Sequence, residues 1–274
     1  MRRAAEGPGG LGLAGRLARQ EVAELAGRLQ RGGWQALGVR RVPEARLDPS
    51  EPTIQRRSKP TGRGYRAIRC PRCRATPELC FCAELRHVAV ASVVITVVMH
   101  FLEEPKPTNT AHLAVQMLSP RARIVLRGAP GLAFDAERTL AQVPAHPVLL
   151  HPTPDAATLT PALAATLPRP LHLIVLDGTW GQARRMLRRE SRLRQLPTLQ
   201  LPSGEPTAYH LRRRIHADGV CTLEAIARAV GVLEGAKPRA QLLHTFGVAM
   251  ERAVRARGYD SAAERDAARS TRPL

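Results

Sequence analysis

The sequence is poor in aromatic residues, in lysine and in acidic residues. Aromatic side chains make up 3% of the 274 residues, and only three of the 42 basic residues are lysine (Lys59, Lys106 and Lys237). A hydrophobic core must therefore be built from Leu, Val, Ile and Ala, which the 44% of apolar residues can supply. With only 23 acidic residues the net charge is +19. This excess favours a polyanionic partner such as nucleic acid, although coding bias can also enrich arginine.

The sequence also lacks long hydrophobic runs. The longest apolar run, residues 88–99, is much shorter than the roughly 20 residues that a membrane span needs. The N-terminal segment has no continuous hydrophobic stretch of the kind found in secretory signals. Its Arg and Ala content is typical of an organelle transit peptide, but Glu6, Glu21 and Glu24 argue against one. We therefore expect a cytoplasmic protein without membrane association.

Four of the five cysteines lie in one short segment, "CPRCRATPELCFC", with the spacing C-x2-C-x6-C-x-C. Four thiolates satisfy a tetrahedral zinc site and leave no open position, so the predicted zinc is structural. An iron–sulfur cluster is the main alternative, because it also uses four thiolates. Cys221 is distant in the sequence and is interpreted as a plain thiol. The predicted metal ligands are Cys70, Cys73, Cys80 and Cys82.

The chain divides into three parts. Residues 1–66 are predicted to be a weakly ordered or accessory extension, residues 67–257 a catalytic α/β domain that begins with the zinc knuckle at 70–82, and residues 258–274 a flexible tail. Short apolar runs predict strands at 88–99, 123–128, 146–152, 171–177 and 197–202. Helical patterns cover 109–118, 154–167 (interrupted by Pro161), 179–191, 221–235 and 238–258. This alternation predicts a mostly parallel sheet with helices on both faces.

Turn-forming and polar residues follow the predicted strands. Ligands of such sheets bind beyond the carboxyl ends of the strands, so these segments together predict a small-molecule pocket, although each could be an ordinary turn. Gly128 and Gly178 allow a ligand to approach the backbone, and helices that begin near Asn109 and Thr179 offer free N–H groups. The sequence has no G-x-G-x-x-G after the first strand, no phosphate-loop motif and no zinc-deaminase motif.

The segment "LDGTWGQARRML" resembles the D-x-T-W signature of the DTW-domain family. Further family motifs follow in order over residues 68–250: the cysteine knuckle, "H…E…TNTAHLA", "LLHPTPDA", "LPTLQL", "YHLRRR" and "CTLEAIA". The resemblance implies a tRNA-uridine aminocarboxypropyltransferase, which moves the 3-amino-3-carboxypropyl group of S-adenosylmethionine to N3 of a uridine in tRNA. The family's relation to an rRNA aminocarboxypropyltransferase implies a SPOUT-like fold with a knotted C-terminal cofactor loop.

Two residues depart from the family pattern. Cys221 stands where the family usually has Ser, and Phe101 where it often has Pro. Since Cys is a poor helix cap, we expect either that Thr222 takes the capping role or that the helix begins loosely.

The resemblance also implies roles for single residues. Asp177, at the end of a buried strand, would accept the N3 proton or orient the base, and the alternative is that it only caps the next helix. Trp180 would stack on a base or attract the sulfonium, unless it packs in the core. The predicted cofactor-binding residues are Asn109, Thr110, Gly128, Gly178, Thr179, Trp180, Thr222 and Glu224. The predicted tRNA contacts are Arg184, Arg185, Arg188, Arg189, Arg212, Arg213 and Arg214, with a solvated basic face as the alternative.

Two other functions fit the same residues. The first is an RNA methyltransferase that uses S-adenosylmethionine, and the second is a zinc-containing RNA-binding protein without catalytic activity. The identity of the uridine and the oligomeric state are not encoded in any pattern of the sequence.

Overall fold

The computed structural model describes residues 67–207, 209 and 219–259. The predicted extension at 1–66, the three arginines at 212–214 and the tail beyond residue 259 lie outside the described residues. Within the described residues, no helix has both the length and the apolar character needed to cross a membrane.

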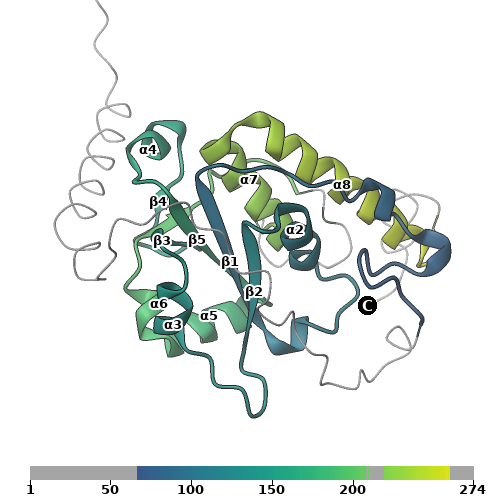
Figure 1. Ribbon diagram of the computed structural model, residues 1–274, viewed down its shortest axis with the longest axis horizontal. Coiled ribbons are helices and arrows are strands. Elements are labelled where there is room, and N and C mark those ends of the chain that lie inside the picture. The colour runs from purple at the N-terminus through teal and green to yellow at the C-terminus, as the bar shows by residue number, and fades with distance from the viewer. Residues whose placement is uncertain (1–66, 208, 210–218, 260–274) are drawn as a thin grey trace, which may run out of the picture.

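A six-stranded sheet forms the centre of the molecule (Figure 1). The strands are β1 (Val93–His100), β2 (Ala122–Arg127), β3 (His146–Leu150), β4 (Ala157–Thr158), β5 (Leu171–Asp177) and β6 (Thr198–Gln200). Their order is β2-β1-β5-β3-β6-β4, and every pairing is parallel. The prediction of a parallel sheet is confirmed, and all the strands therefore direct their carboxyl ends to one edge.

Helices cover both faces of this sheet, as predicted. On one side lie α2 (Ala111–Leu118), α7 (Thr222–Glu234) and α8 (Ala236–Arg255), and on the other α3 (Ala136–Ala141), α5 (Trp180–Arg189) and α6 (Ser191–Arg194) (Figure 1). The central strand β5 is buried along its whole length because both of its faces are covered. Alternate residues of β1 consequently belong to two separate hydrophobic clusters, Val97 to one and Val98 to the other.

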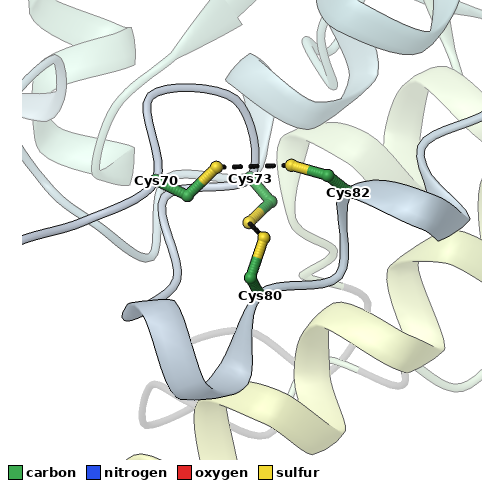
Figure 2. Close-up of side chains that lie close together, drawn as sticks. All are labelled: Cys70, Cys73, Cys80 and Cys82. Carbon is green, nitrogen blue, oxygen red and sulfur yellow. Dashed lines mark hydrogen bonds between the residues drawn. The ribbon is translucent and has the colours of Figure 1, made fainter.

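The described chain begins with the cysteine segment, which contains two short 3-10 helices, η4 (Pro77–Leu79) and η5 (Cys82–Glu84) (Figure 2). Phe81 and Cys73 are buried and belong to the larger hydrophobic cluster. Thr245 of α8 donates a hydrogen bond of 3.0 Å to the carbonyl oxygen of Glu84. The segment is therefore attached to the helical layer that contains α7 and α8.

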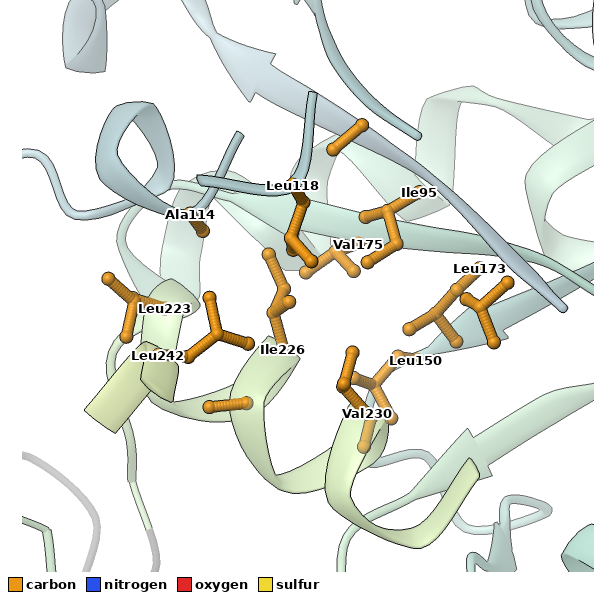
Figure 3. Close-up of a cluster of buried hydrophobic side chains, with 14 of the residues drawn as sticks. Ile95, Ala114, Leu118, Leu150, Leu173, Val175, Leu223, Ile226, Val230 and Leu242 are labelled. Carbon is orange, nitrogen blue, oxygen red and sulfur yellow. The ribbon is translucent and has the colours of Figure 1, made fainter. Parts of the chain in front are cut away.

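The larger cluster fixes α7 against the sheet (Figure 3). Ile226 and Val230 of α7 are fully buried and face Leu150 and Val175 of the strands. Burial of one such side chain contributes about 1.5–3 kcal/mol. The position of α7 is thus set by the core, and its first residues are placed beside the edge where the strands end.

Some predicted boundaries are wrong. The first strand starts at Val93 rather than at residue 88, because the preceding residues bond to helices: Val88 N–H donates to the carbonyl of Met117, and Ser92 N–H donates to the Glu234 side chain. The predicted helix at 154–167 is a short strand, β4, followed by α4 (Pro161–Thr166). Pro161 starts that helix instead of interrupting it, since proline suits the first turn.

The prediction also missed α3 and α6, while the helix predicted at 179–191 corresponds to α5. Asp135 caps α3 by accepting the Arg138 N–H at 2.9 Å. The knotted cofactor loop stays a prediction, because part of the segment between β6 and α7 lies outside the described residues.

Candidate active site

Asp177 ends β5 and is 5% exposed. Its Oδ2 accepts a hydrogen bond from Asn109 Nδ2 at 2.6 Å, and its Oδ1 accepts one from Thr222 Oγ1 at 2.5 Å. In the sheet, Asp177 pairs with Met99 of β1. One buried carboxylate thus joins the end of β5 to the segments that begin α2 and α7.

The side-chain amide of Asn109 bonds both to the start of α2 and to the Asp177 carboxylate. Its Oδ1 accepts the N–H groups of Ala111 at 3.0 Å and His112 at 3.3 Å, while its Nδ2 donates to Asp177. Thr110 is buried, and its Oγ1 accepts the N–H of Leu223 in the first turn of α7 at 3.4 Å. The N-termini of α2 and α7 therefore converge on Asp177, where their positive dipole ends favour the charged carboxylate.

The start of α7 is more ordered than its sequence implied. Cys221 occupies the N-cap position, and Glu224 accepts the Cys221 N–H at 3.2 Å. Glu224 is 2% exposed and also accepts a hydrogen bond of 2.5 Å from Thr207. The expectation of a cap by Thr222 or of a loose helix start is wrong, because Thr222 donates to Asp177 instead.

The turn that follows Asp177 is closed by a capping box. Thr179 is the N-cap of α5: its Oγ1 accepts the Gln182 N–H at 3.3 Å, and its own N–H donates to Gln182 Oε1 at 2.6 Å. Asp177 is therefore not the cap of this helix, and that alternative is wrong. Gly178 is needed for the close packing here, since a Cβ atom on it would lie 3.0 Å from the Cβ of Gln182.

Trp180 begins α5 and is partly exposed. Its ring lies against His151, with 6.0 Å between the ring centroids and 44° between the planes. His151 directly follows β3 and is buried, and this burial lowers its pKa, with a smaller contribution from Arg184. The structure thus places Trp180 at the edge between β3 and β5, and not fully within the core.

His100 ends β1 on the other side of Asp177. Its Nδ1 accepts the N–H of Leu102 at 3.3 Å and lies 3.3 Å from Nε2 of Gln182. Gly128 follows β2 with a φ of +83°, a conformation that favours glycine, and a Cβ atom there would lie 3.6 Å from the ring of Phe101. The segments that follow β1, β2, β3 and β5 therefore lie along one edge of the sheet, as parallel pairing requires.

Sequence reasoning missed three residues of this edge: His100, His151 and Gln182. Their positions in the sequence could have indicated them. His100 ends a strand, His151 directly follows one, and Gln182 lies three residues after the Thr179 cap, where a capping box has Glu or Gln.

The exposed residues of α5 are largely basic. Ala183 and Met186 are buried against the sheet, whereas the four predicted arginines of this helix are exposed: Arg184, Arg185, Arg188 and Arg189. The other predicted contacts, Arg212, Arg213 and Arg214, lie outside the described residues.

The four clustered cysteines meet the requirements of a metal site (Figure 2). All four sulfur atoms lie within 4.8 Å of one another, with 3.3 Å between Cys70 and Cys82 and 3.6 Å between Cys73 and Cys80. Sulfur atoms bound tetrahedrally to zinc at about 2.3 Å stand about 3.8 Å apart. The backbone N–H of Cys73, then the Cys82 side chain and the N–H of Arg72, lower the pKa of Cys70 to about 6. This favours the thiolate at Cys70, whereas burial raises the pKa of Cys73 and of Cys82. The geometry of the four sulfur atoms is therefore the observation that shows a cluster able to hold a metal ion.

Arg74 connects this cluster to the segment that follows β1. Its φ of +60° turns the chain within the knuckle. Its guanidinium donates to the carbonyl oxygen of Glu104 at 2.7 Å and forms an ion pair with the Glu104 carboxylate at 3.5 Å. Glu104 and the neighbouring Glu103 are buried, and Lys106 pairs with Glu103 at 2.5 Å. The cysteine cluster therefore braces the segment that leads to Asn109.

Residues 67–254, well over half of the chain, match the family model described as the DTW domain. The chain belongs to the DTW domain family. This membership confirms the resemblance that the ordered motifs predict. The matched range includes all the residues of the site described above.

Curated proteins similar to this DTW domain are named tRNA-uridine aminocarboxypropyltransferase 2. The protein from Macaca fascicularis is 26% identical over 168 residues, 60% of this chain and 56% of that protein. The Drosophila melanogaster protein is 27% identical, covering 62% of this chain and 68% of its own length. The Mus musculus protein is 28% identical, covering 64% and 59%. The similar region thus spans little more than half of the macaque protein.

A solved structure also matches this DTW domain: the SAM-dependent rRNA:acp-transferase Tsr3 from Vulcanisaeta distributa. The match has a TM-score of 0.39 and 19% sequence identity, and it covers 64% of this chain and 88% of that one.

Proposed function

We propose that this DTW protein transfers the 3-amino-3-carboxypropyl group of S-adenosylmethionine to N3 of a uridine in tRNA, forming acp3U and methylthioadenosine. The observation that carries the proposal is the buried Asp177 carboxylate, held by Asn109 and Thr222 at the carboxyl edge of the sheet. The names of the curated relatives support the same reaction.

The reaction needs a base and a held nucleophile. S-Adenosylmethionine supplies an electrophilic carbon next to a sulfonium. N3 of uridine loses its proton and forms a bond to that carbon, and the electron pair of the broken carbon–sulfur bond stays on sulfur as neutral methylthioadenosine. In this proposal Asp177 accepts the N3–H hydrogen bond and takes the proton, since Asn109 and Thr222 hold its carboxylate in place where β5 ends.

The residues around Asp177 hold the co-substrate. The N–H groups of Ala111 and Leu223 are already bonded to Asn109 and Thr110. In this proposal the carboxylate of the co-substrate is therefore attracted only by the positive dipole ends of α2 and α7. Trp180 offers a ring for stacking or for attraction of the sulfonium. Two other predicted residues, Thr179 and Glu224, act indirectly, because their side chains are engaged in shaping the turns at the starts of α5 and α7.

The cysteine cluster binds zinc in this proposal. A closed set of four thiolates suits a structural zinc ion, which supplies folding free energy and no chemistry at the site. The exposed arginines of α5 contact tRNA phosphates, and the cytoplasm is the proposed location.

Product analysis distinguishes the proposed reaction from its alternatives. The pure protein is incubated with tRNA and S-adenosylmethionine, and nucleosides and small products are identified by mass spectrometry. We expect acp3U together with equimolar methylthioadenosine. Formation of S-adenosylhomocysteine would instead indicate methyl transfer. Salt-sensitive tRNA binding with no affinity for S-adenosylmethionine would indicate a non-catalytic RNA-binding protein.

A further inference from the structure

The hydrogen bonds of Gln182 indicate which ring nitrogen of His100 carries the proton. Gln182 Oε1 accepts the Thr179 N–H at 2.6 Å, so the other arm of this amide is its NH2 group, a donor. That donor lies 3.3 Å from Nδ1 of His100, and the N–H of Leu102 also donates to Nδ1 at 3.3 Å. A ring nitrogen that accepts hydrogen bonds from two N–H donors must carry a lone pair and no proton. His100 is therefore the tautomer that carries its proton on Nε2.

His100 stands directly beside the Asp177 turn. A Cβ atom on Gly178 would lie 3.6 Å from the Cβ of His100, and the preceding residue, Met99, pairs with Asp177. The imidazole stacks on Phe101, with 5.1 Å between ring centroids and 27° between planes. The ring is thus fixed by stacking and by two hydrogen bonds next to the proposed site of reaction.

The Nε2–H group of His100 can donate a hydrogen bond to a bound molecule. Within the described part of the chain, no hydrogen-bond partner of Nε2 is found, and the side chain is only partly buried. Burial lowers the pKa of His100. Of the charged groups around it, Glu103 opposes this shift, while Arg127, Arg185 and Lys106 add to it. The ring therefore stays neutral near pH 7 and presents a fixed, uncharged N–H donor.

We propose that the Nε2–H of His100 donates a hydrogen bond to the carbonyl oxygen O4 of the target uracil and so selects uridine over cytidine. This inference rests on the proposed function. When N3 loses its proton, negative charge spreads onto the two carbonyl oxygens of uracil, and a preorganised donor stabilises that charge. Cytosine has an amino group in place of O4, so a donor would face a donor. Discrimination of this kind is strong because the mismatch leaves polar groups unpaired.

Two substitutions of His100 distinguish the effect of losing the N–H donor from the effect of losing the aromatic ring. His100→Phe keeps an aromatic ring over Phe101 but removes the donor, whereas His100→Gln keeps an N–H near the position of Nε2. We expect His100→Phe to lower the single-turnover rate of acp3U formation about 10²-fold, the size of effect seen when one such donor is lost. We expect His100→Gln to recover most of the lost rate.

The same variants are compared for melting temperature and for affinity to S-adenosylmethionine, which we expect to stay near the wild-type values. His87→Phe, at an exposed histidine, is the matched control and should retain the wild-type rate. A wild-type rate in His100→Phe, or no recovery in His100→Gln, would overturn the role of His100 while leaving the proposed reaction intact. If the wild-type protein forms no acp3U on any tRNA, the proposed function fails and this role fails with it.

Discussion

Asp177 shares its carboxylate between segments that are distant in the sequence. Asn109 lies 68 residues before it and Thr222 lies 45 residues after it, yet each donates to a different carboxylate oxygen. Because both oxygens accept a hydrogen bond, the orientation of the carboxylate is fixed. At the residue scale, the site is therefore built by positioning one acidic group, with His100 at the end of β1 and Trp180 at the start of α5.

Gly178 offers a sharp test of how tightly this turn is packed. In Gly178→Ala the new Cβ would meet Gln182, at 3.0 Å from Cβ and 3.1 Å from Oε1, so the capping box must shift. We expect the free energy of unfolding to fall by about 1–3 kcal/mol, as for other overpacked positions. Chemical denaturation measures this change.

Gly181→Ala is the matched control for that substitution. Gly181 lies two residues after the Thr179 cap, in α5, and a Cβ atom there would meet nothing within 4 Å. Alanine favours a helix over glycine by about 1 kcal/mol, so this variant should be as stable as the wild type or more stable. Equal stability of the two variants would show that the turn is looser than described.

At the scale of elements, the cysteine segment and the segment after β1 act as one unit. Arg74 joins them through the backbone and the side chain of Glu104, and the chain then continues to Asn109 and α2. Packing of Phe81 in the core and the bond from Thr245 to Glu84 attach the same unit to α8. If the cysteines hold the proposed zinc ion, its loss should therefore weaken both the fold and the position of Asn109.

Metal content and stability test this connection. We expect one zinc ion per chain and a colourless protein, and we expect Cys73→Ser to lose the zinc and to melt several degrees lower, because metal binding is coupled to folding. Cys221→Ser should keep the zinc and its melting temperature, since serine is a good N-cap for α7. Elemental analysis and calorimetry give both quantities. A brown protein that contains iron, or full zinc in Cys73→Ser, would contradict the account.

At the scale of the whole molecule, the net charge is +19. In the described part of the chain, some of this positive charge lies on one surface, which the exposed arginines of α5 form. This helix begins at the Asp177 turn, so phosphates bound along it would belong to nucleotides near the modified base. Under the proposed function, the charge would give affinity for tRNA without sequence preference, and residues at the strand ends would carry the chemistry.

The salt dependence of tRNA binding tests this division. We expect Arg188→Ala to weaken tRNA binding and to reduce the slope of log K against log salt concentration by about 1, the effect of one lost phosphate contact. Arg255→Ala, at the end of α8, is the control and should keep the wild-type slope. Fluorescence anisotropy at several salt concentrations measures both slopes. Equal slopes for the two variants would mean that the α5 arginines form only a solvated face.

The sequence predicted the architecture and the central carboxylate, because apolar runs such as that of β5 and the D-x-T-W motif are local patterns. It did not predict the bond between Thr222 and Asp177, since nothing local shows which helix N-terminus will meet a strand end. It also misplaced the start of the helix at Pro161, where the neighbouring strand β4 pairs with β6. Local pattern thus identified the segments that meet at the carboxyl edge of the sheet, and tertiary pairing decided what their side chains contact.

The most direct test of the account compares two aspartate-to-asparagine variants in single-turnover formation of methylthioadenosine and acp3U. Asp177→Asn removes the proposed proton acceptor, and Asp135→Asn is the control, because asparagine caps a helix as well as aspartate does. We predict that Asp177→Asn lowers the rate about 10²–10⁴-fold while it still binds S-adenosylmethionine, and that Asp135→Asn stays at the wild-type rate. A wild-type rate in Asp177→Asn would contradict the central claim.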